Sequence, residues 1–518
     1  MRFYIVSDTH LTSKSNWDCD PYTLPRPIDH LCYRESSQII KKAFDLIIAD
    51  KTTDIVFITG DLTNLGDWDS HKEMKYEIER LQANGKRVFA YPAGHDFTTA
   101  DEYSFRFDKN GKKIPQKKAD TKEVFEWYKK TWENDVIAID DSSYSYIAQL
   151  DEKTRLIILI AKDNKDNRLV ITDETMNWAS HQITQAKSQN MTIFASVHHP
   201  ILYPSPIYKI IAPHDMIANN DEIAKSLSDA GVDVIFTGHS HMHDIEYKVY
   251  ENGKTFYDIT TGALTGYLPC MRIADYNNKN KILEVKTIYI DDIETELGCC
   301  LQEYSYQGFI GFMEKMVYSM GDDINTFAKM AIGMSMKPAK VKKLSWIITP
   351  LGKFINHSTF GRIGKWTRKE TGFNKKDFAD IKDKKIVPYI INCIKCLYTG
   401  DADLNPNSKE YAIIMSFIAI LDNITDKLPI NIKDKLHGNN LKDIVQPLLY
   451  NEGICDKEAK IYLDDKAPKR EKLKEFTSKK GGKILTILII SIIILSPILI
   501  PTSLFFALVI SIRNLFIN

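Results

Sequence analysis

The sequence has no excess of charge of either sign, because 68 lysine and arginine residues face 68 aspartate and glutamate residues. Wholesale binding of nucleic acid needs a basic surface that displaces counterions, so this balance argues against it and leaves room only for a local basic patch. With 44% hydrophobic and 26% charged residues, the composition is that of a folded protein. A chain of 518 residues is too long for one ordinary domain, and two or three folding units are expected.

Cysteine is scarce, and a secretory signal is missing from the first residues. Eight cysteines in a chain of this size do not form a disulfide framework, and thiols in a reducing compartment are the simpler interpretation. Cys393 and Cys396 form a C-x-x-C pair, but without a second pair or neighbouring histidines we favour structural thiols over zinc. Met1–Val6 leads directly into a predicted strand, with no basic segment followed by a long apolar run, so no export signal is expected.

Up to about Ile293, short apolar runs alternate with amphipathic patterns, which predicts an α/β layered fold. The predicted buried strands are Phe3–Val6, Ile55–Thr59, Val88–Ala90, Leu156–Ile160, Thr192–Val197 and Val234–Thr237. The predicted helices are Glu35–Ala49, His71–Ala83, Glu174–Ser188 and Asp221–Ala230. An Asn-Gly pair between Ile245–Tyr250 and Thr255–Ile259 predicts a hairpin, and a second hairpin is expected at Asn277–Lys281.

From about Gly298 onward the pattern changes to helical segments separated by polar links, such as Phe309–Tyr318, Val387–Leu397 and Tyr411–Leu421. We predict three regions: a catalytic domain over residues 1–293, a mostly helical domain over residues 298–480, and a membrane segment over residues 484–512. Tyr411–Leu421 is apolar on all sides but too short to cross a bilayer, so a core helix is expected.

The last region has no charged residue between Lys483 and Arg513, and Ile484–Ile500 is almost wholly apolar. That run satisfies the length rule for a membrane span, although Pro497 and Pro501 leave a re-entrant hairpin or a buried hairpin as alternatives. Basic residues gather just before it, and the positive-inside rule then keeps this side in the cytoplasm. We therefore predict a tail-anchored protein of the cell membrane whose catalytic domain faces the cytoplasm.

Carboxylates and imidazoles follow five of the predicted strands, at the strand ends where α/β sheets place active sites. The segments are Ser7-Asp8-Thr9-His10, Gly60-Asp61-Leu62-Thr63-Asn64, Ala93-Gly94-His95-Asp96, His198-His199-Pro200 and Gly238-His239-Ser240-His241. Their mixed oxygen and nitrogen donors suit Mn, Fe or Zn better than Ca.

Spacing explains how neighbouring ligands in these segments can reach one metal centre. In D-x-H and H-x-H, side chains two apart share one face if the chain is extended. Gly60 and Gly238 permit sharp turns before the ligands. Each motif alone is weak, but five in order, each after a strand, predict a metal site.

The ordered set Asp8-x-His10, Gly60-Asp61, Gly94-His95-Asp96, His198 and Gly238-His239-x-His241 resembles the signature of calcineurin-like metallophosphoesterases over roughly residues 1–290. The resemblance implies a four-layer α-β-β-α sandwich with two metal ions. It implies that Asp8, His10 and His241 hold the first metal, that Asp61 bridges both, and that His198 and His239 hold the second. It also implies that His95 meets the substrate phosphate and that Asp96 orients His95.

One position departs from the family pattern. The family has Asn before the catalytic His, and its amide oxygen binds the second metal, whereas this chain has Gly94. Water can fill the gap, but occupancy of the second site should fall. His199 stays outside the predicted ligand set, because beside a ligand and before Pro200 it is interpreted as shaping the turn.

The resemblance implies hydrolysis of a phosphoester by a metal-activated hydroxide, with His95 stabilising charge or protonating the leaving oxygen. Gly60-Asp61-Leu62-Thr63, followed by Gly66 and His71, is similar to bacterial cyclic-nucleotide phosphodiesterases, which favours a nucleotide-like phosphodiester as substrate. A lipid-linked phosphoester is the alternative that the apolar tail suggests. A non-catalytic scaffold on a decayed fold is the alternative that Gly94 suggests, although the other ligands and His95 are retained. A nuclease is disfavoured by the charge balance.

Overall fold

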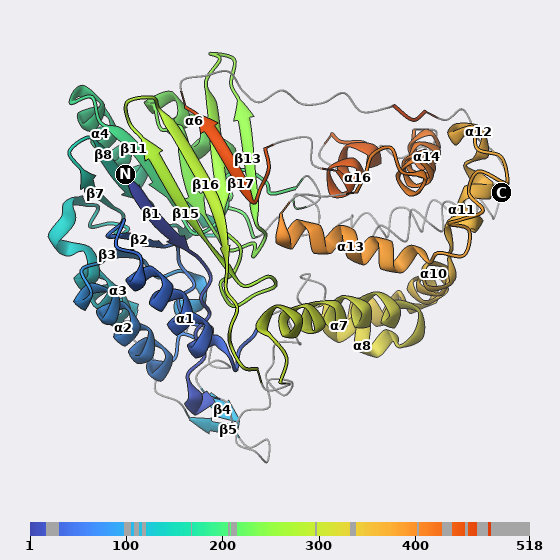
Figure 1. Ribbon diagram of the computed structural model, residues 1–518, viewed down its shortest axis with the longest axis horizontal. Coiled ribbons are helices and arrows are strands. Elements are labelled where there is room, and N and C mark those ends of the chain that lie inside the picture. Colours follow the sequence, from blue (N-terminus) through green and yellow to red (C-terminus); the bar gives the residue numbers. More distant parts are fainter. Residues whose placement is uncertain are drawn as a thin grey trace.

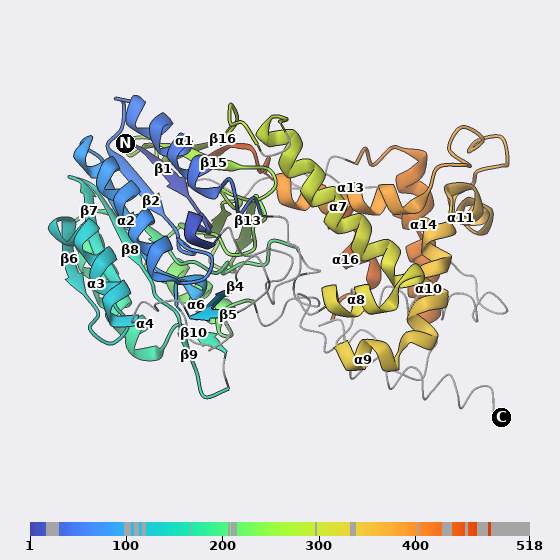
Figure 2. The ribbon, with the colours of Figure 1, turned by 90° about the horizontal axis from the view of Figure 1, so that it is seen from below.

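The structure is a computed structural model, and it describes most of the chain. The described residues are 1–16, 31–97, 105–107, 113–115, 121–166, 168–205, 208, 215–295, 298–331, 338–400, 404–426, 438–450, 454–463 and 475–477. Figure 1 shows a part built from two sheets with helices outside them, and a helical part beside it. Figure 2 shows the same two parts side by side after a quarter turn.

Six strands form the first sheet, in the order β17-β16-β15-β1-β2-β3. Their bounds are Arg2–Val6 (β1), Ile55–Ile58 (β2), Arg87–Ala90 (β3), Cys270–Asn277 (β15), Ile282–Tyr289 (β16) and Glu458–Tyr462 (β17). The strands β1, β2 and β3 are parallel, and their register aligns Val6 with Ile58 and Ile58 with Ala90. Because these three strands end at one level, the loops that follow them leave the sheet side by side.

Seven strands form the second sheet, in the order β13-β14-β12-β11-β8-β7-β6. Their bounds are Val136–Ile139 (β6), Tyr146–Asp151 (β7), Thr154–Ile158 (β8), Thr192–Ser196 (β11), Val234–Thr237 (β12), Asp244–Val249 (β13) and Thr255–Thr260 (β14). The strands β8, β11, β12 and β14 are parallel, and Ser196 pairs with Phe236. The loops after β11 and β12 therefore also start next to each other.

The two sheets pack face to face over an aromatic core. The rings of Phe3, Phe57, Phe194 and Phe236 contact one another across it, and the Phe3 ring lies 4.8 Å from Phe57 and 5.5 Å from Phe236. Five helices cover the outer faces: Ser36–Ala49 (α1), Trp68–Ala83 (α2) and Thr121–Trp132 (α3) on the first sheet, and Asp173–Ser188 (α4) and Asn220–Ala230 (α6) on the second. This layering agrees with the predicted α-β-β-α sandwich.

Local sequence explains how these helices begin and end. The side chain of Asp67 accepts a hydrogen bond from the amide of Ser70 and so caps α2, and Thr172 caps α4 in the same way through Thr175. The helix α6 ends at Gly231, whose φ of 92° is the left-handed cap that glycine adopts without strain. The Asp67 cap also marks the end of the loop that follows β2.

The predicted strands, helices and both hairpins are present, with ends shifted by a few residues. The sequence-based prediction missed α3, β6 and β7, and aromatic residues contribute to the packing of two of these elements. The rings of Trp132 on α3 and Tyr146 on β7 stack with centroids 3.8 Å apart. Two short strand pairs also carried no signal, Phe105–Phe107 (β4) with Lys113–Pro115 (β5) and Lys162–Asp163 (β9) with Leu169–Val170 (β10). Three-residue 3-10 turns lie at Lys14–Asn16, Gly94–Asp96 and Glu133–Asp135.

The second part of the chain is helical, as predicted. Its helices are Leu301–Asp322 (α7), Ile324–Met330 (α8), Pro338–Lys343 (α9), Ser345–His357 (α10), Phe360–Trp366 (α11), Arg368–Thr371 (α12), Ile386–Thr399 (α13), Lys409–Thr425 (α14) and Leu441–Leu449 (α16). The apolar segment expected as a core helix is α14, and its Tyr411, Met415 and Leu421 are buried in the main helical core. Cys393 and Cys396 lie buried on α13.

One strand from the predicted helical region belongs to the first sheet. The strand β17 pairs antiparallel with β16, the edge that the sheet would otherwise leave open, and Figure 1 shows it beside β16. The buried guanidinium of Arg272 donates a hydrogen bond to the Asp456 carbonyl over 2.7 Å, and the Asp456 carboxylate accepts one from the Ile245 amide. The two parts are therefore joined by a shared sheet and are not separated by one boundary near residue 298.

The predicted membrane segment, residues 484–512, lies outside the described residues. Within the part of the chain that the structure describes, no helix is both long and apolar enough to cross a bilayer.

Candidate metal centre

Strand ends from both sheets bring the predicted ligands together, and unusual backbone conformations aim their side chains. Five of the six predicted ligands have a positive φ, with values of 49° at Asp8, 38° at His10, 47° at Asp61, 64° at His239 and 56° at His241. Non-glycine residues rarely adopt this left-handed region, and such strain concentrates at functional sites. The explanation from an extended chain is therefore wrong. Left-handed turns, not strand alternation, direct Asp8 with His10 and His239 with His241 into one site.

The two glycines before the ligands serve different needs. Gly60 has a φ of 94°, and a Cβ there would lie 2.6 Å from Nδ1 of His198, so both conformation and space require glycine. Gly238 has no positive φ, but a Cβ there would collide with the side chains of Ser7 and Asp8. The expected sharp turn thus applies to Gly60, whereas Gly238 lets the loop after β12 approach the loop after β1.

Asp8, His10 and His241 form the first group of potential ligands. Oδ1 of Asp8 lies 3.4 Å from Nε2 of His241 and 3.6 Å from Nε2 of His10, and those two nitrogens are 2.9 Å apart. Ligand atoms held ~2.1 Å from one ion lie roughly 3 to 3.5 Å apart, close to this spacing. The other oxygen of Asp8 accepts a hydrogen bond from the His239 amide over 2.9 Å, while the fully buried Oδ1 accepts none. That unsatisfied oxygen facing two imidazole nitrogens fits a cation.

Asp61 lies at the centre of the site. Its Oδ2 is 3.0 Å from Nε2 of His198, 3.9 Å from Nε2 of His95 and 4.0 Å from Nε2 of His10. Asp61 and Asp8 form one potential ligand group with His198, and Asp61 forms another with His10 and His95. The carboxylate therefore reaches both sides of the cluster, as a bridging ligand must.

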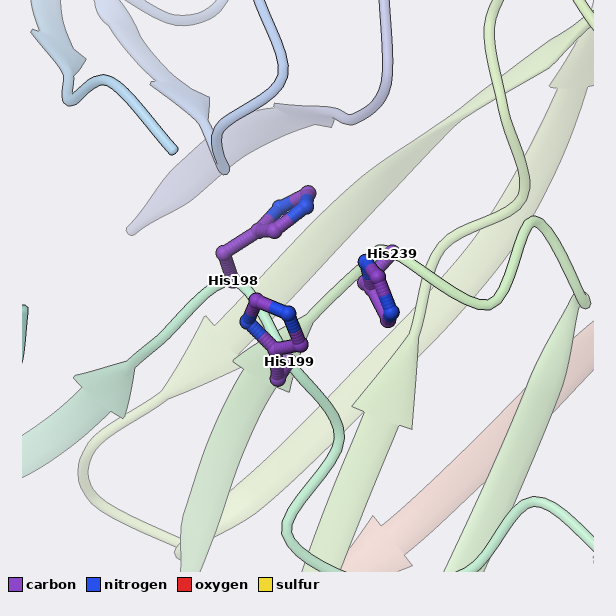
Figure 3. Close-up of side chains that lie close together, drawn as sticks. All are labelled: His198, His199 and His239. Carbon is purple, nitrogen blue, oxygen red and sulfur yellow. The ribbon is translucent and has the colours of Figure 1, made fainter. Parts of the chain in front are cut away.

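His198, His199 and His239 form a further group, shown in Figure 3. Nδ1 of His198 donates a hydrogen bond to the Thr59 carbonyl over 2.7 Å, which leaves Nε2 toward Asp61. His199 was expected to shape the turn, yet its nitrogen joins those of His198 and His239 within 4.8 Å of one another. The signal was available in the sequence, because His199 is adjacent to a predicted ligand.

The buried charges of the cluster depend on one another. Burial favours the neutral carboxyl at Asp8 and Asp61, but the surrounding imidazoles, His198 first among them, hold the pKa of both well below the ordinary value. Burial opposes charge on His198 too, yet Asp61 and Asp8 raise its pKa to about 9. Burial and the charge of His198 lower the pKa of His239 to about 3. Metal binding would require His198 to give up its proton.

His95 lies at the open side of the cluster, with 24% of its side chain exposed. Its amide donates a hydrogen bond to Oδ1 of Asp61 over 2.9 Å, and its Nδ1 lies 3.0 Å from the Asn64 carbonyl. Since a carbonyl only accepts, Nδ1 carries a proton, and Nε2 is the nitrogen on the side of Asp61, 3.9 Å from its Oδ2.

Asp96 does not orient His95 in the way that the resemblance implies. Its two oxygens accept four hydrogen bonds, from the amides of Ala93, Leu62 and Thr63 and from the Thr63 hydroxyl, at 2.7 to 3.0 Å. The buried carboxylate thus ties the loop after β2 to the loop after β3, and the Asn64 carbonyl fixes the His95 ring. Burial, together with the charge of Asp61, raises the pKa of Asp96 to about 7.

A carboxylate in the second sheet has the same role as Asp96 and was not predicted from the sequence. Asp258 on β14 is buried, and its oxygens accept hydrogen bonds from the amides of Ile201 and Leu202 and from the Thr237 hydroxyl, at 2.6 to 2.8 Å. It ties the loop that carries His198 and His199 to the strand that leads to His239. The available signal was a charged residue inside a strand that is buried along its whole length.

Gly66 and His71, which favoured the resemblance to cyclic-nucleotide enzymes, support the loop of Asp96. Nε2 of His71 lies 2.9 Å from the Asp96 carbonyl and Nδ1 lies 2.9 Å from the Tyr128 hydroxyl. Gly66 has a φ of 61°, and a Cβ there would lie 2.8 Å from the same carbonyl. Both residues therefore support the loop that carries Asp96.

Comparison with known proteins agrees with this geometry, because residues 1–243 match the calcineurin-like phosphoesterase family. This part, somewhat less than half of the chain, is similar to calcineurin-like phosphoesterases. The recognition from the motif residues is thereby confirmed, and the donor set of the phosphoesterase domain fits a pair of metal ions. Gly94 contributes no side chain to that set.

Several solved structures resemble the chain at low identity. A dimetal phosphatase from Danio rerio is 13% identical with a TM-score of 0.41, and the match covers 55% of this chain and 95% of that one. A purple acid phosphatase from Lupinus luteus is 12% identical with a TM-score of 0.36, covering 56% and 51%. The NAD nucleotidase of Haemophilus influenzae is 12% identical with a TM-score of 0.29, covering 70% and 61%. No curated protein matches the chain.

Proposed function

We propose that this protein is a metal-dependent phosphodiesterase that hydrolyses a nucleotide-like phosphodiester. The observation that carries the proposal is the convergence of Asp8, Asp61 and the imidazoles in overlapping groups, with His95 at their open side. The proposed ligands are those of the family pattern: Asp8, His10 and His241 for one ion, Asp61 for both, and His198 with His239 for the second. The two ions, when bound, supply charge that polarises the phosphoryl group and lowers the pKa of the attacking water.

The residues of this chain would then act in defined ways. Asp8 and Asp61 balance the positive charge that gathers at the site, and the hydrogen bond from His198 to the Thr59 carbonyl fixes which nitrogen faces the ions. His95 approaches the substrate through Nε2. In its protonated form it donates a hydrogen bond to a phosphoryl oxygen, or a proton to the leaving oxygen, while Nδ1 stays bonded to Asn64.

The choice of a nucleotide-like diester rests on the form of the sequence motif, and the lipid-linked alternative rests on the apolar run Ile484–Ile500. The same run supports the proposal that the enzyme is tail-anchored with its catalytic domain on the cytoplasmic side, because basic residues precede it. Protease added to intact cells should leave the catalytic domain uncut. Digestion of that domain from outside would contradict this topology.

The test compares hydrolysis by the full-length protein with Mn²⁺ of a fluorogenic diester, the matching monoester, cyclic nucleotides and a phospholipid in vesicles. We expect the diester and cyclic nucleotides to be cleaved. Preference for the monoester would contradict a phosphodiesterase, and cleavage only in vesicles would favour the lipid-linked substrate. A protein that binds metal but cleaves nothing would be a scaffold.

A second test removes the carboxylate of Asp61, which lies at the centre of the site. Asp61→Ala should lose most bound metal and essentially all hydrolysis, because Asp61 reaches both sides of the cluster. The matched control is Asp229→Ala, a partly exposed aspartate outside the site. Elemental analysis of both purified variants decides the outcome, and normal metal content in Asp61→Ala would overturn the proposed site.

A further inference from the structure

We propose that His199 takes the place of the missing asparagine as a ligand of the second metal ion, which it would share with Asp61, His198 and His239. The inference rests on the proposed metal site. It changes one assignment from the family pattern: the shell of the second ion is completed by a protein side chain from another loop and not by water alone.

The structure has room at Gly94 for the asparagine side chain that the family pattern places there. A Cβ built on Gly94 would have no atom within 4 Å outside its neighbours in the chain, and Gly94 has no positive φ. The glycine is therefore required neither for space nor for backbone conformation. The chain has lost a ligand at Gly94 without a local structural reason, and that loss is tolerable if another donor supplies the contact.

His199 lies where such a donor is needed. Adjacent side chains of an extended chain point to opposite faces, yet the ring centroids of His198 and His199 are only 5.0 Å apart. The centroid of the His199 ring is 3.9 Å from that of His239, and Figure 3 shows the two rings side by side. Both partners are residues that the family pattern assigns to the second ion.

The surroundings of His199 favour a ligand over a residue that shapes a turn. The residue is 7% exposed, and its ring nitrogens form no hydrogen bond with the residues that the structure describes. The turn is instead held by Asp258, which accepts hydrogen bonds from the amides of Ile201 and Leu202. A turn stabilised by those bonds has no need of the His199 ring.

The distances set what must change when an ion binds. The three ligand nitrogens lie within 4.8 Å of one another, whereas donors on one ion lie roughly 3 to 3.5 Å apart. A closure of about 1 to 2 Å is within reach of ring rotations about the side-chain bonds. The carboxylate of Asp61, already 3.0 Å from Nε2 of His198, would complete four protein donors.

The experiment measures metal content and affinity in full-length protein, independently of activity. His199→Phe keeps an aromatic ring beside His239 but removes both nitrogens, and Gly94→Asn restores the family ligand where the structure leaves room. Four proteins are compared: wild type, each single variant and the double variant. Each is stripped with chelator, titrated with Mn²⁺ by calorimetry, and analysed for bound Mn after dialysis.

We expect two ions per chain in the wild type. In His199→Phe, the second ion should bind more weakly by a factor larger than the roughly 10- to 100-fold that loss of an outer hydrogen-bond partner costs. Gly94→Asn should change little alone but should restore tight binding in the double variant. Such strong non-additivity identifies two residues that serve one contact. His181→Ala, on the surface of α4, is the histidine control and should bind two ions normally.

The outcomes separate this inference from the proposed function. Two tightly bound ions in His199→Phe would overturn the role of His199 and leave the metal site standing, whereas a wild type without bound ions would overturn the site itself. Thermal melts in chelator check that His199→Phe folds. If it does not, His199→Ala takes its place in the same comparison, and failure of Gly94→Asn to rescue a folded His199 variant overturns the inference.

Discussion

The two sheets contribute different chemistry to the same site. The strands β1, β2 and β3 deliver both buried carboxylates, Asp8 and Asp61, while β11 and β12 deliver only imidazoles. The charges complement each other across the junction: Asp61 and Asp8 raise the pKa of His198 to about 9, and His198 in turn lowers theirs. Neither sheet carries a complete set of donors, so the centre forms only when the sandwich closes.

The two halves of the site, one from each sheet, nevertheless hold their loops in the same way, through a buried carboxylate. In the first sheet Asp96 joins the loops after β2 and β3, and in the second Asp258 joins the loop after β11 to the end of β12. Burial, as the main cause, raises the pKa of each to about 7. The difference between the halves therefore lies in the ligands and not in how the loops are held.

The largest effect is expected from replacing one histidine in each half. These two substitutions distinguish a residue that acts in catalysis from one that binds metal. His95→Gln in the first half should lower kcat by ~10²- to 10⁴-fold with two ions retained, because it removes a proton donor and not a ligand. His239→Gln in the second half should lower metal content as well. Kinetics and elemental analysis of both variants check this contrast. Loss of metal in His95→Gln would make His95 a ligand, as its grouping with His10 and Asp61 permits.

An intermediate effect should come from removing the two supporting carboxylates. Asp96→Ala leaves four hydrogen-bond donors without an acceptor and Asp258→Ala leaves three, so each should lower the free energy of unfolding by roughly 2 to 3 kcal/mol. Asp258→Ala should also weaken only the ion held by the second half. Urea unfolding and Mn²⁺ titration measure both, with Asp229→Ala as control. Equal weakening of both ions by Asp258→Ala would show that the halves do not act separately.

The smallest effect concerns pH. Because folding raises the pKa of Asp258 to about 7, the folded protein holds a proton there that the unfolded chain releases at about pH 4. The stabilisation is complete below that pH and is lost as the pH rises through 7. Between pH 6 and 7, the wild type should lose about 1 kcal/mol of unfolding free energy relative to Asp258→Asn. If the urea midpoints of the two proteins change with pH in the same way over this interval, the pKa of Asp258 is not raised.

Some features of this protein follow from its sequence alone. Apolar runs of three to six residues located the parallel strands, because strands buried on both faces are mostly apolar. Polar motifs directly after those runs identified the potential ligands and the phosphoesterase family, because side chains at strand ends are the ones that a sheet brings together. The loss of a ligand at Gly94 is equally plain from the sequence.

Other features were decided only by the tertiary structure, because they depend on which loops meet. The left-handed turns at Asp8 and His239, the loop-tying role of Asp96 and Asp258, and the position of His199 beside His239 all involve contacts between segments far apart in the chain. Likewise, β17 pairs with β16, which lies some 170 residues earlier in the chain, since Lys286 pairs with Glu458. Hydrophobic periodicity tells which face of an element is buried, but it contains no information about the partner that buries it.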